Sequence, residues 1–171
     1  MNILNEKRAS SLLMLLLLVV GLVLVGCSSE SAEPKSAEPT DPYVVTDIVW
    51  EWETLKVATG TVDEYGRAMR EATTIPNPEN YILILREDGT FSGTADCNQI
   101  SGAYTADGGY SFTLGPSTMA ACGPDSLDQQ FLELLGSVVA GGPDGGGGFA
   151  LETAAGGERM EFRNGGLAPA Q

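Results

Sequence analysis

Apolar and polar residues alternate in the centre of the segment VTDIVWEWETLKV, residues 45–57. Ile48, Trp50 and Trp52 would lie on one face of an extended chain, and the opposite face carries two glutamates. A period of two residues is typical of a β-strand with one buried face. We therefore predict that this segment is a half-buried strand.

Short turns separate further segments that have the composition of strands. The turns EDGT and DGG contain glycines that can adopt a positive φ, as tight hairpins require. Because short turns connect neighbouring strands, these segments are expected to form an antiparallel meander. The expected strands are 81–87, 90–96, 102–106 and 110–114, with a last pair at 149–153 and 159–163.

A helical period follows in residues 127–139. The apolar residues recur at helical spacing and would form a single stripe that faces a core. Ser126 and Gln129 have the spacing of a capping box at the start of such a helix. The stripe consists of Leu127, Phe131, Leu134, Leu135, Val138 and Val139.

Other segments lack such periodicity. Residues 59–80 contain two prolines and are expected to form a long connection, with a short helix near residues 64–72. Residues 140–148, AGGPDGGGG, are expected to end the helix in a flexible loop, and residues 166–171 to be a frayed tail. The whole pattern predicts an α+β fold, in which a strongly curved, barrel-like antiparallel sheet of about seven or eight strands packs on one amphipathic helix.

The first 26 residues have the organisation of a bacterial signal peptide. Lys7 and Arg8 precede an apolar run at 12–25, whose 14 residues fall short of the span of about 20 that crosses a bilayer. Residues 24–27, LVGC, resemble a lipobox, where signal peptidase cleaves before a lipid-bearing cysteine. An uncleaved anchor helix is the alternative. We expect residues 1–26 to be removed and Cys27 to be the lipidated first residue of the mature chain.

A polar segment separates this cysteine from the expected domain. Residues 28–42, SSESAEPKSAEPTDP, contain no aromatic and no large aliphatic residue, so they cannot bury enough apolar surface to fold. We expect residues 27–42 to be the lipidated cysteine and a disordered tether, and residues 43–165 to be the folded domain. The lipid on Cys27 would hold the chain on the membrane, in the cell envelope outside the cytoplasmic membrane.

The composition excludes several classes of function. The formal net charge is −14, from 9 Lys+Arg and 23 Asp+Glu, so a nucleic-acid partner is not expected. The chain contains no histidine, which excludes Ser-His-Asp and Cys-His catalytic sets and removes the commonest zinc ligand. The sequence also lacks the patterns of a calcium loop and of a phosphate loop. We expect no metal, no cofactor and no enzymatic activity.

Cys97 and Cys122 remain as an even pair once Cys27 carries lipid. In an oxidising compartment a disulfide between them is the default expectation. Closing a loop between cysteines 25 positions apart would contribute about 3 kcal/mol. Free buried thiols and a redox-active or nucleophilic cysteine are the alternatives. The latter is disfavoured, because the chain has no His and the carboxylate of Asp96 would disfavour a thiolate.

Two motifs resemble those of a known family. ADCNQISGAYTADG, residues 95–108, resembles the C-N-x-x-x-G-x-Y segment of META/HslJ-like domains, and STMAAC, residues 117–122, resembles their second signature, often T-x-M-A-C. Asp96 replaces a Gly that commonly precedes the C-N pair, and Ala120 replaces the usual Met. The resemblance extends over about residues 47–162. The matching positions besides the cysteines are Asn98, Gly102, Tyr104, Thr118 and Ala121.

The resemblance implies a compact α+β fold with a strongly bent antiparallel sheet against a helix. Such domains recur in bacterial envelope lipoproteins and are associated with heat shock, drug tolerance and envelope maintenance, and no enzymatic activity is implied. From the residues themselves we expect structural roles. Asn98 would cap a turn and Gly102 would permit a bulge or close packing. Tyr104 would enter the core with its hydroxyl at the rim, and Thr118 would bond the loop backbone. Ligand contacts are the alternative.

These features favour a non-enzymatic envelope lipoprotein that binds or protects another envelope component. The first alternative is an inhibitor of secreted proteases on a membrane tether, in which a mobile loop such as 140–148 enters a cleft. That alternative is argued from architecture alone. An enzyme that uses only carboxylates is a third possibility.

The lipobox interpretation makes a direct prediction. Mass spectrometry of the membrane fraction should find Cys27 as the N-terminal residue with a thioether-linked acyl group. Cys27→Ser should release or mislocalise the protein, because the acyl chains supply its attachment to the bilayer. Recovery of the wild-type chain with residues 1–26 attached, or with an unmodified Cys27, would contradict the interpretation.

Overall fold

The computed structural model describes residues 44–154 and 157–170. Cys27, the expected signal peptide and the tether lie outside the described residues. The described chain forms one nine-stranded sheet with a short α-helix, and every pair of neighbouring strands is antiparallel. This confirms the predicted α+β class. No helix in the described part is long and apolar enough to cross a membrane.

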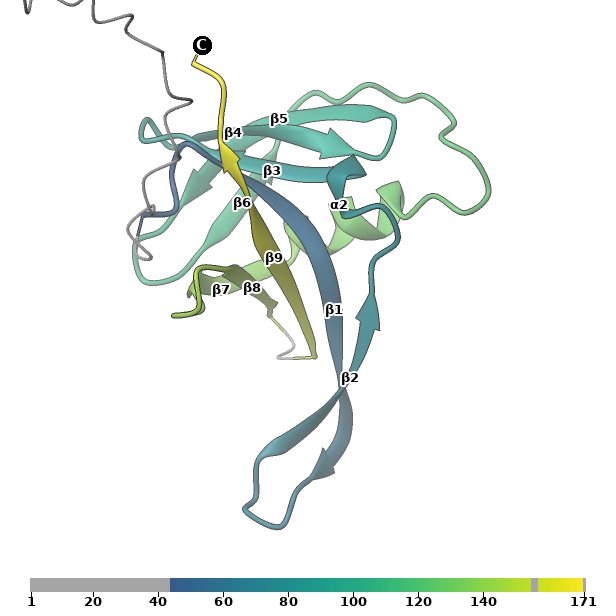
Figure 1. Cartoon of the computed structure of the whole chain (residues 1–171), viewed down its shortest axis with the longest axis vertical. Coiled ribbons are helices and arrows are strands. Elements are labelled where there is room, and N and C mark those ends of the chain that lie inside the picture. The colour runs from purple at the N-terminus through teal and green to yellow at the C-terminus, as the bar shows by residue number, and fades with distance from the viewer. Residues whose placement is uncertain (1–43, 155–156, 171) are drawn as a thin grey trace, which may run out of the picture. The chain divides into compact units, whose positions relative to one another are not determined.

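Eight strands lie side by side in the order β6-β5-β4-β3-β1-β9-β8-β7, and β2 pairs with β1 outside this path. The two edge strands of this order, β6 and β7, approach each other. Gly109, next to β6, lies so close to β7 that a Cβ on it would collide with the carbonyl of Val139. The curved sheet is therefore nearly closed into a barrel (Figure 1). The strands are β1 (Ile48–Val62), β2 (Ala68–Thr74), β3 (Tyr81–Leu85), β4 (Thr90–Ala95), β5 (Asn98–Thr105), β6 (Ser111–Leu114), β7 (Val138–Pro143), β8 (Phe149–Thr153) and β9 (Glu158–Leu167).

The core lies between the concave face of the sheet and helix α2 (Asp128–Gly136). Ile48, Trp50 and Trp52 are buried on one face of β1, as the alternation predicts. The indole of Trp52 packs against the ring of Phe131 from the helix, with ring centroids 5.4 Å apart. Aromatic pairs of this kind join the helix to the centre of the sheet. The meander of β3 to β6 also forms as predicted.

The helix is shorter than the apolar stripe suggested. It ends at Gly136, and Val138 and Val139 belong to β7, where the first is buried and the second is 49% exposed. Those two residues fit a helical stripe on paper, but they alternate across a strand. Of the expected capping box, the Ser126 hydroxyl accepts a hydrogen bond from the N–H of Asp128 at 3.2 Å rather than from that of Gln129. The N-cap is Leu127, and its N–H donates to the phenol oxygen of Tyr81 at 2.9 Å.

Residues 59–80 contain a hairpin rather than the expected helix near 64–72. β1 continues to Val62, the chain turns at Gly66 with a positive φ of 77°, and β2 returns alongside β1. A short 3₁₀ helix, Pro78–Asn80, leads into β3. Threonine and valine at this ribbon's positions favour strand over helix, and the ribbon projects beyond the rest of the sheet (Figure 1).

The glycine-rich stretch 140–148 is not one flexible loop. Its first part is strand, because Ala140, Gly141 and Gly142 pair with β8. The remainder is a tight turn in which the carboxylate of Asp144 accepts hydrogen bonds from backbone N–H groups two and four residues later, at 2.7 and 2.9 Å. Thus the mobile loop expected at 140–148 is replaced by a strand and a short turn.

The C-terminal segment is also more ordered than expected. β9 extends to Leu167, and the N–H of Ala168 donates to the carbonyl of Asp47 at 2.8 Å. The expectation of a frayed tail from residue 166 was therefore wrong for its first residues. The chain end is tied to the start of β1, and these terminal bonds add to the pairing of β1 with β9.

Substitutions of two glycines in residues 140–148 test whether the first part of this stretch is a strand rather than the expected loop. In Gly141→Ala the new Cβ would lie 2.7 Å from the carbonyl oxygen of Ala150 and from a methyl carbon of Leu151. This substitution should lower the free energy of unfolding by about 1–3 kcal/mol in urea titrations. The matched control Gly146→Ala meets only ordinary contacts and should change stability by less than about 0.5 kcal/mol. Equal effects of the two variants would contradict the strand.

Candidate functional site

The two sequence motifs meet at the turn between β4 and β5. Asp96 and Cys97 form this two-residue turn, and Ala95 pairs with Asn98 across it. Asp96 has a φ of 55°, which glycine adopts without steric cost and Asp tolerates better than most residues. The positive φ of Asp96 gives a physical reason why META/HslJ-like domains commonly have a glycine before the C-N pair.

A disulfide joins this turn to the connection between β6 and α2. Cys97 and Cys122 are bonded, with Cα atoms 5.4 Å apart. The predicted bridge is therefore confirmed. Cys97 is exposed and Cys122 is half-buried, so the bridge lies at the surface rather than in the core. It pins the segment that leads into the helix onto the edge of a hairpin.

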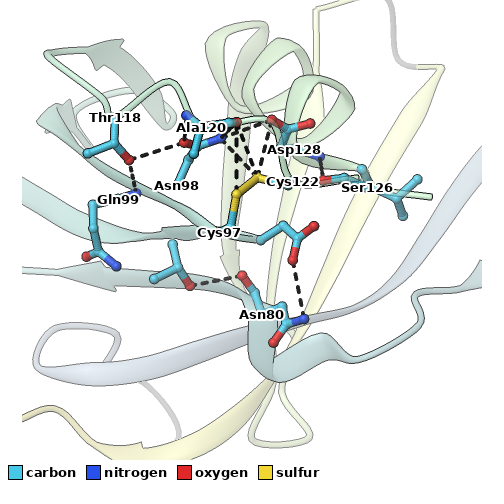
Figure 2. Close-up of a disulfide and its surroundings, with 12 residues drawn as sticks. Asn80, Cys97, Asn98, Gln99, Thr118, Ala120, Cys122, Ser126 and Asp128 are labelled. Carbon is cyan, nitrogen blue, oxygen red and sulfur yellow. Dashed lines mark hydrogen bonds between the residues drawn. A yellow bond between two sulfur atoms is a disulfide. The ribbon is translucent and has the colours of Figure 1, made fainter. Parts of the chain in front are cut away.

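The side chain of Asn98 is the buried polar centre of the cluster, with an exposed fraction of 4%. Its Oδ1 accepts hydrogen bonds from the N–H of Ala120 at 2.8 Å and the hydroxyl of Thr118 at 3.2 Å. Its Nδ2 donates to the carbonyl of Ala120 at 3.2 Å and the carboxylate of Asp128 at 3.1 Å. Figure 2 shows these partners around the amide. Asn98 was expected to cap a local turn. Instead it ties β5 to a distant loop and to the helix.

Thr118 bonds the strand rather than its own loop, in contrast to the expectation. Its hydroxyl accepts from the N–H of Gln99 at 2.8 Å, and its own N–H donates to the carbonyl of Gln99 at 3.1 Å. Together with the contacts of Ala120 and Cys122, these bonds place every second residue of the loop against β5 and its turn (Figure 2). The loop is thus attached to the sheet at three points within five residues.

Every residue of the connection from 115 to 121 is exposed. Ser117, Met119 and Ala121 are exposed, and the Met119 side chain has an exposed fraction of 95%. We name residues 115–124 the Met119 loop. It carries no charged residue, and prolines lie at its second and last positions. The motif residue Ala121 is therefore exposed and does not lie in a buried pocket.

Gly102 allows close packing, as expected, and Tyr104 is half-buried against the core rather than inside it. A Cβ on Gly102 would lie 2.6 Å from the Phe91 ring, so close packing requires glycine there. The Tyr104 hydroxyl donates to the carbonyl of Arg86 at 2.8 Å, which ties the turn between β3 and β4 to β5. Partial burial raises the pKa of the Tyr104 phenol, and nearby negative charge adds to the shift. The phenol therefore stays protonated and remains a donor at neutral pH.

The geometry is that of a clamp, in which one side chain joins a strand, a loop and the start of a helix. The oxygen and nitrogen of the Asn98 amide are both occupied by protein partners, so this side chain has little capacity left for a ligand. On the other side of the disulfide lies a pocket of about 240 Å³ lined largely by polar residues, among them Asn77, Asn80 and Asp125. The exposed feature of the cluster is the Met119 loop.

Comparison with known proteins assigns the family. The family model described as the META domain matches residues 51–165. The chain belongs to the META domain family. The resemblance of the two motifs is thereby confirmed, and in this META domain they form one cluster around Asn98.

Two solved structures share the fold of this META domain. A protein from Burkholderia xenovorans, solved by NMR, is 25% identical, with a TM-score of 0.52 over 81% of this chain and 96% of that chain. A DUF4847 family protein from Bacteroides vulgatus, solved by crystallography, is 12% identical, with a TM-score of 0.51 over 70% of this chain and 94% of that chain. The second likeness concerns the fold alone. No curated protein matches the chain.

Sequence reasoning missed three residues of the cluster. In the family signature the Met usually stands at the position of Ala120, whereas here it is residue 119. This shift by one position was a signal that the Met side chain is exposed. Asp128 and Tyr81 gave no such signal. Their contacts with Asn98 and with the helix start join elements that are far apart in the sequence.

The turn of the META domain makes a prediction about Asp96. Asp96→Gly should raise the free energy of unfolding by about 0.5–1 kcal/mol, because glycine adopts the positive φ without a Cβ clash. Asp96→Ala keeps a Cβ and loses the polar side chain, so it should lower stability by about 1 kcal/mol. Urea denaturation of the oxidised proteins measures both. A lower stability for Asp96→Gly than for Asp96→Ala would contradict this account of the turn.

Proposed function

We propose that the chain is a non-enzymatic envelope lipoprotein whose META domain binds another component of the cell envelope. The N-terminal sequence supports anchoring through lipid on Cys27, outside the cytoplasmic membrane. The chain belongs to the META family, and the association of META/HslJ-like domains with envelope maintenance supports such a role under stress. The partner is an envelope protein or ligand and not a nucleic acid, because the net charge is −14.

The observation that carries the proposal is the way in which the motifs use their polar groups. Asn98, Thr118 and the disulfide direct their bonding capacity inward, and the product of these bonds is an exposed loop with a fixed backbone. A preorganised loop loses little conformational entropy when it binds, so each contact contributes more to affinity. The most exposed large apolar side chain of the described residues, Met119, lies on this loop.

Photo-crosslinking in intact cells tests the proposal. A photoreactive phenylalanine analogue at position 119 of the full chain should give an adduct of one defined mass. The same analogue at Asp107, which is exposed in the turn at the opposite end of β5, is the matched control and should give none.

The Cys27→Ser form should lose the adduct at position 119, because the chain no longer resides at the membrane. Identical adducts from positions 119 and 107, or none from either position, would contradict the proposed binding surface.

A further inference from the structure

We propose that the Met119 loop inserts into the substrate cleft of a serine endopeptidase that has an apolar specificity pocket. Met119 fills that pocket, and the peptide bond between Met119 and Ala120 lies where a substrate would be cleaved. The inference rests on the proposed binding function and names its partner class. The segment differs from residues 140–148, which the sequence had suggested for such a role and which are strand and turn.

The loop backbone has the conformation that a protease cleft accepts. Thr118 and Ala120 bond the scaffold through backbone groups, and Met119 between them does not, so backbone bonding alternates along the loop as it does along an extended strand. Extended peptides bind by adding main-chain hydrogen bonds to a partner, with alternate side chains in its pockets. The Met119 loop presents such an edge outward.

The hydrogen bonds of the loop leave the required groups free. The scaffold uses the N–H of Thr118 and both backbone groups of Ala120. Within the part of the chain that the structure describes, neither Met119 nor Ala121 forms a hydrogen bond with the scaffold. In a serine protease, the carbonyl of the residue before the scissile bond must reach the oxyanion hole. The free carbonyl here is that of Met119.

The side chain at this position selects the class of pocket. Met119 is unbranched and 95% exposed, and a methionine adapts to an apolar slot of irregular shape. No Lys or Arg occurs in residues 115–124, so a pocket with a buried carboxylate would be left without a partner. The loop therefore fits chymotrypsin-like or subtilisin-like endopeptidases and rejects trypsin-like ones.

The clamp makes the loop an inhibitor rather than a substrate. If the protease serine attacks the carbonyl of Met119, an ester forms, and the peptide nitrogen of Ala120 leaves as an amine with a proton from the protease histidine. Asn98 and the bond between Cys97 and Cys122 hold that amine beside the ester. Its high effective concentration favours return attack, which re-forms the peptide bond and consumes no water.

Inhibition assays with the full-length, detergent-solubilised protein test the inference. It should inhibit chymotrypsin or subtilisin and leave trypsin unaffected. Met119→Gly should weaken this inhibition by about 100-fold. Leu167→Gly removes another exposed apolar side chain away from the loop and should have no effect. Met119→Arg should transfer inhibition to trypsin, a gain that misfolding cannot produce.

A variant without the bridge, with Cys97→Ser and Cys122→Ser, should be cut between Met119 and Ala120, as mass spectrometry of the fragments would show. Failure to inhibit both apolar-pocket proteases, or an unchanged specificity of Met119→Arg, would overturn the inference. A crosslinked partner at position 119 that is not a protease would also overturn it, although the proposed binding function would stand.

Discussion

The arrangement of this domain depends on the burial of one carboxamide. An unsatisfied polar group in the position of the Asn98 side chain would cost about 1–3 kcal/mol. Its oxygen and nitrogen find their partners only when the loop, the hairpin turn and the first residue of the helix converge. The amide therefore fixes the path of the loop relative to the hairpin turn and the start of the helix, and the disulfide holds that path in place.

The core and the clamp stabilise different parts of the domain, which explains why the motifs contain polar residues. Aromatic packing around Trp52 joins helix to sheet without help from the motif residues. The motif residues instead determine the path of a connection that has no regular secondary structure of its own. Irregular backbone needs side-chain partners in place of ladder hydrogen bonds, and Asn98 and Thr118 supply them.

Local patterns were sufficient to predict a large part of the fold. The face of β1, the hairpins from β3 to β6 and the cysteine pair follow from alternation, turn glycines and redox context. The errors arose where a pattern has two solutions. Val138 and Val139 fit both a helix and a strand, and the outcome depends on pairing with β8. The partners of Asn98 lie 20 to 30 positions away, so no local signal could identify them.

The position of β1 has a consequence for the order in which the molecule can assemble. The first strand of the sheet lies between β3 and β9, and Trp52 is in register with Phe162, a residue far later in the sequence. The hairpins of the middle can form early, but the sheet has a gap beside its first strand until the last strand arrives. Contacts between residues so far apart in sequence slow folding. Until β9 has been synthesised and has paired, the two tryptophans of β1 therefore lack one of the neighbours that bury them.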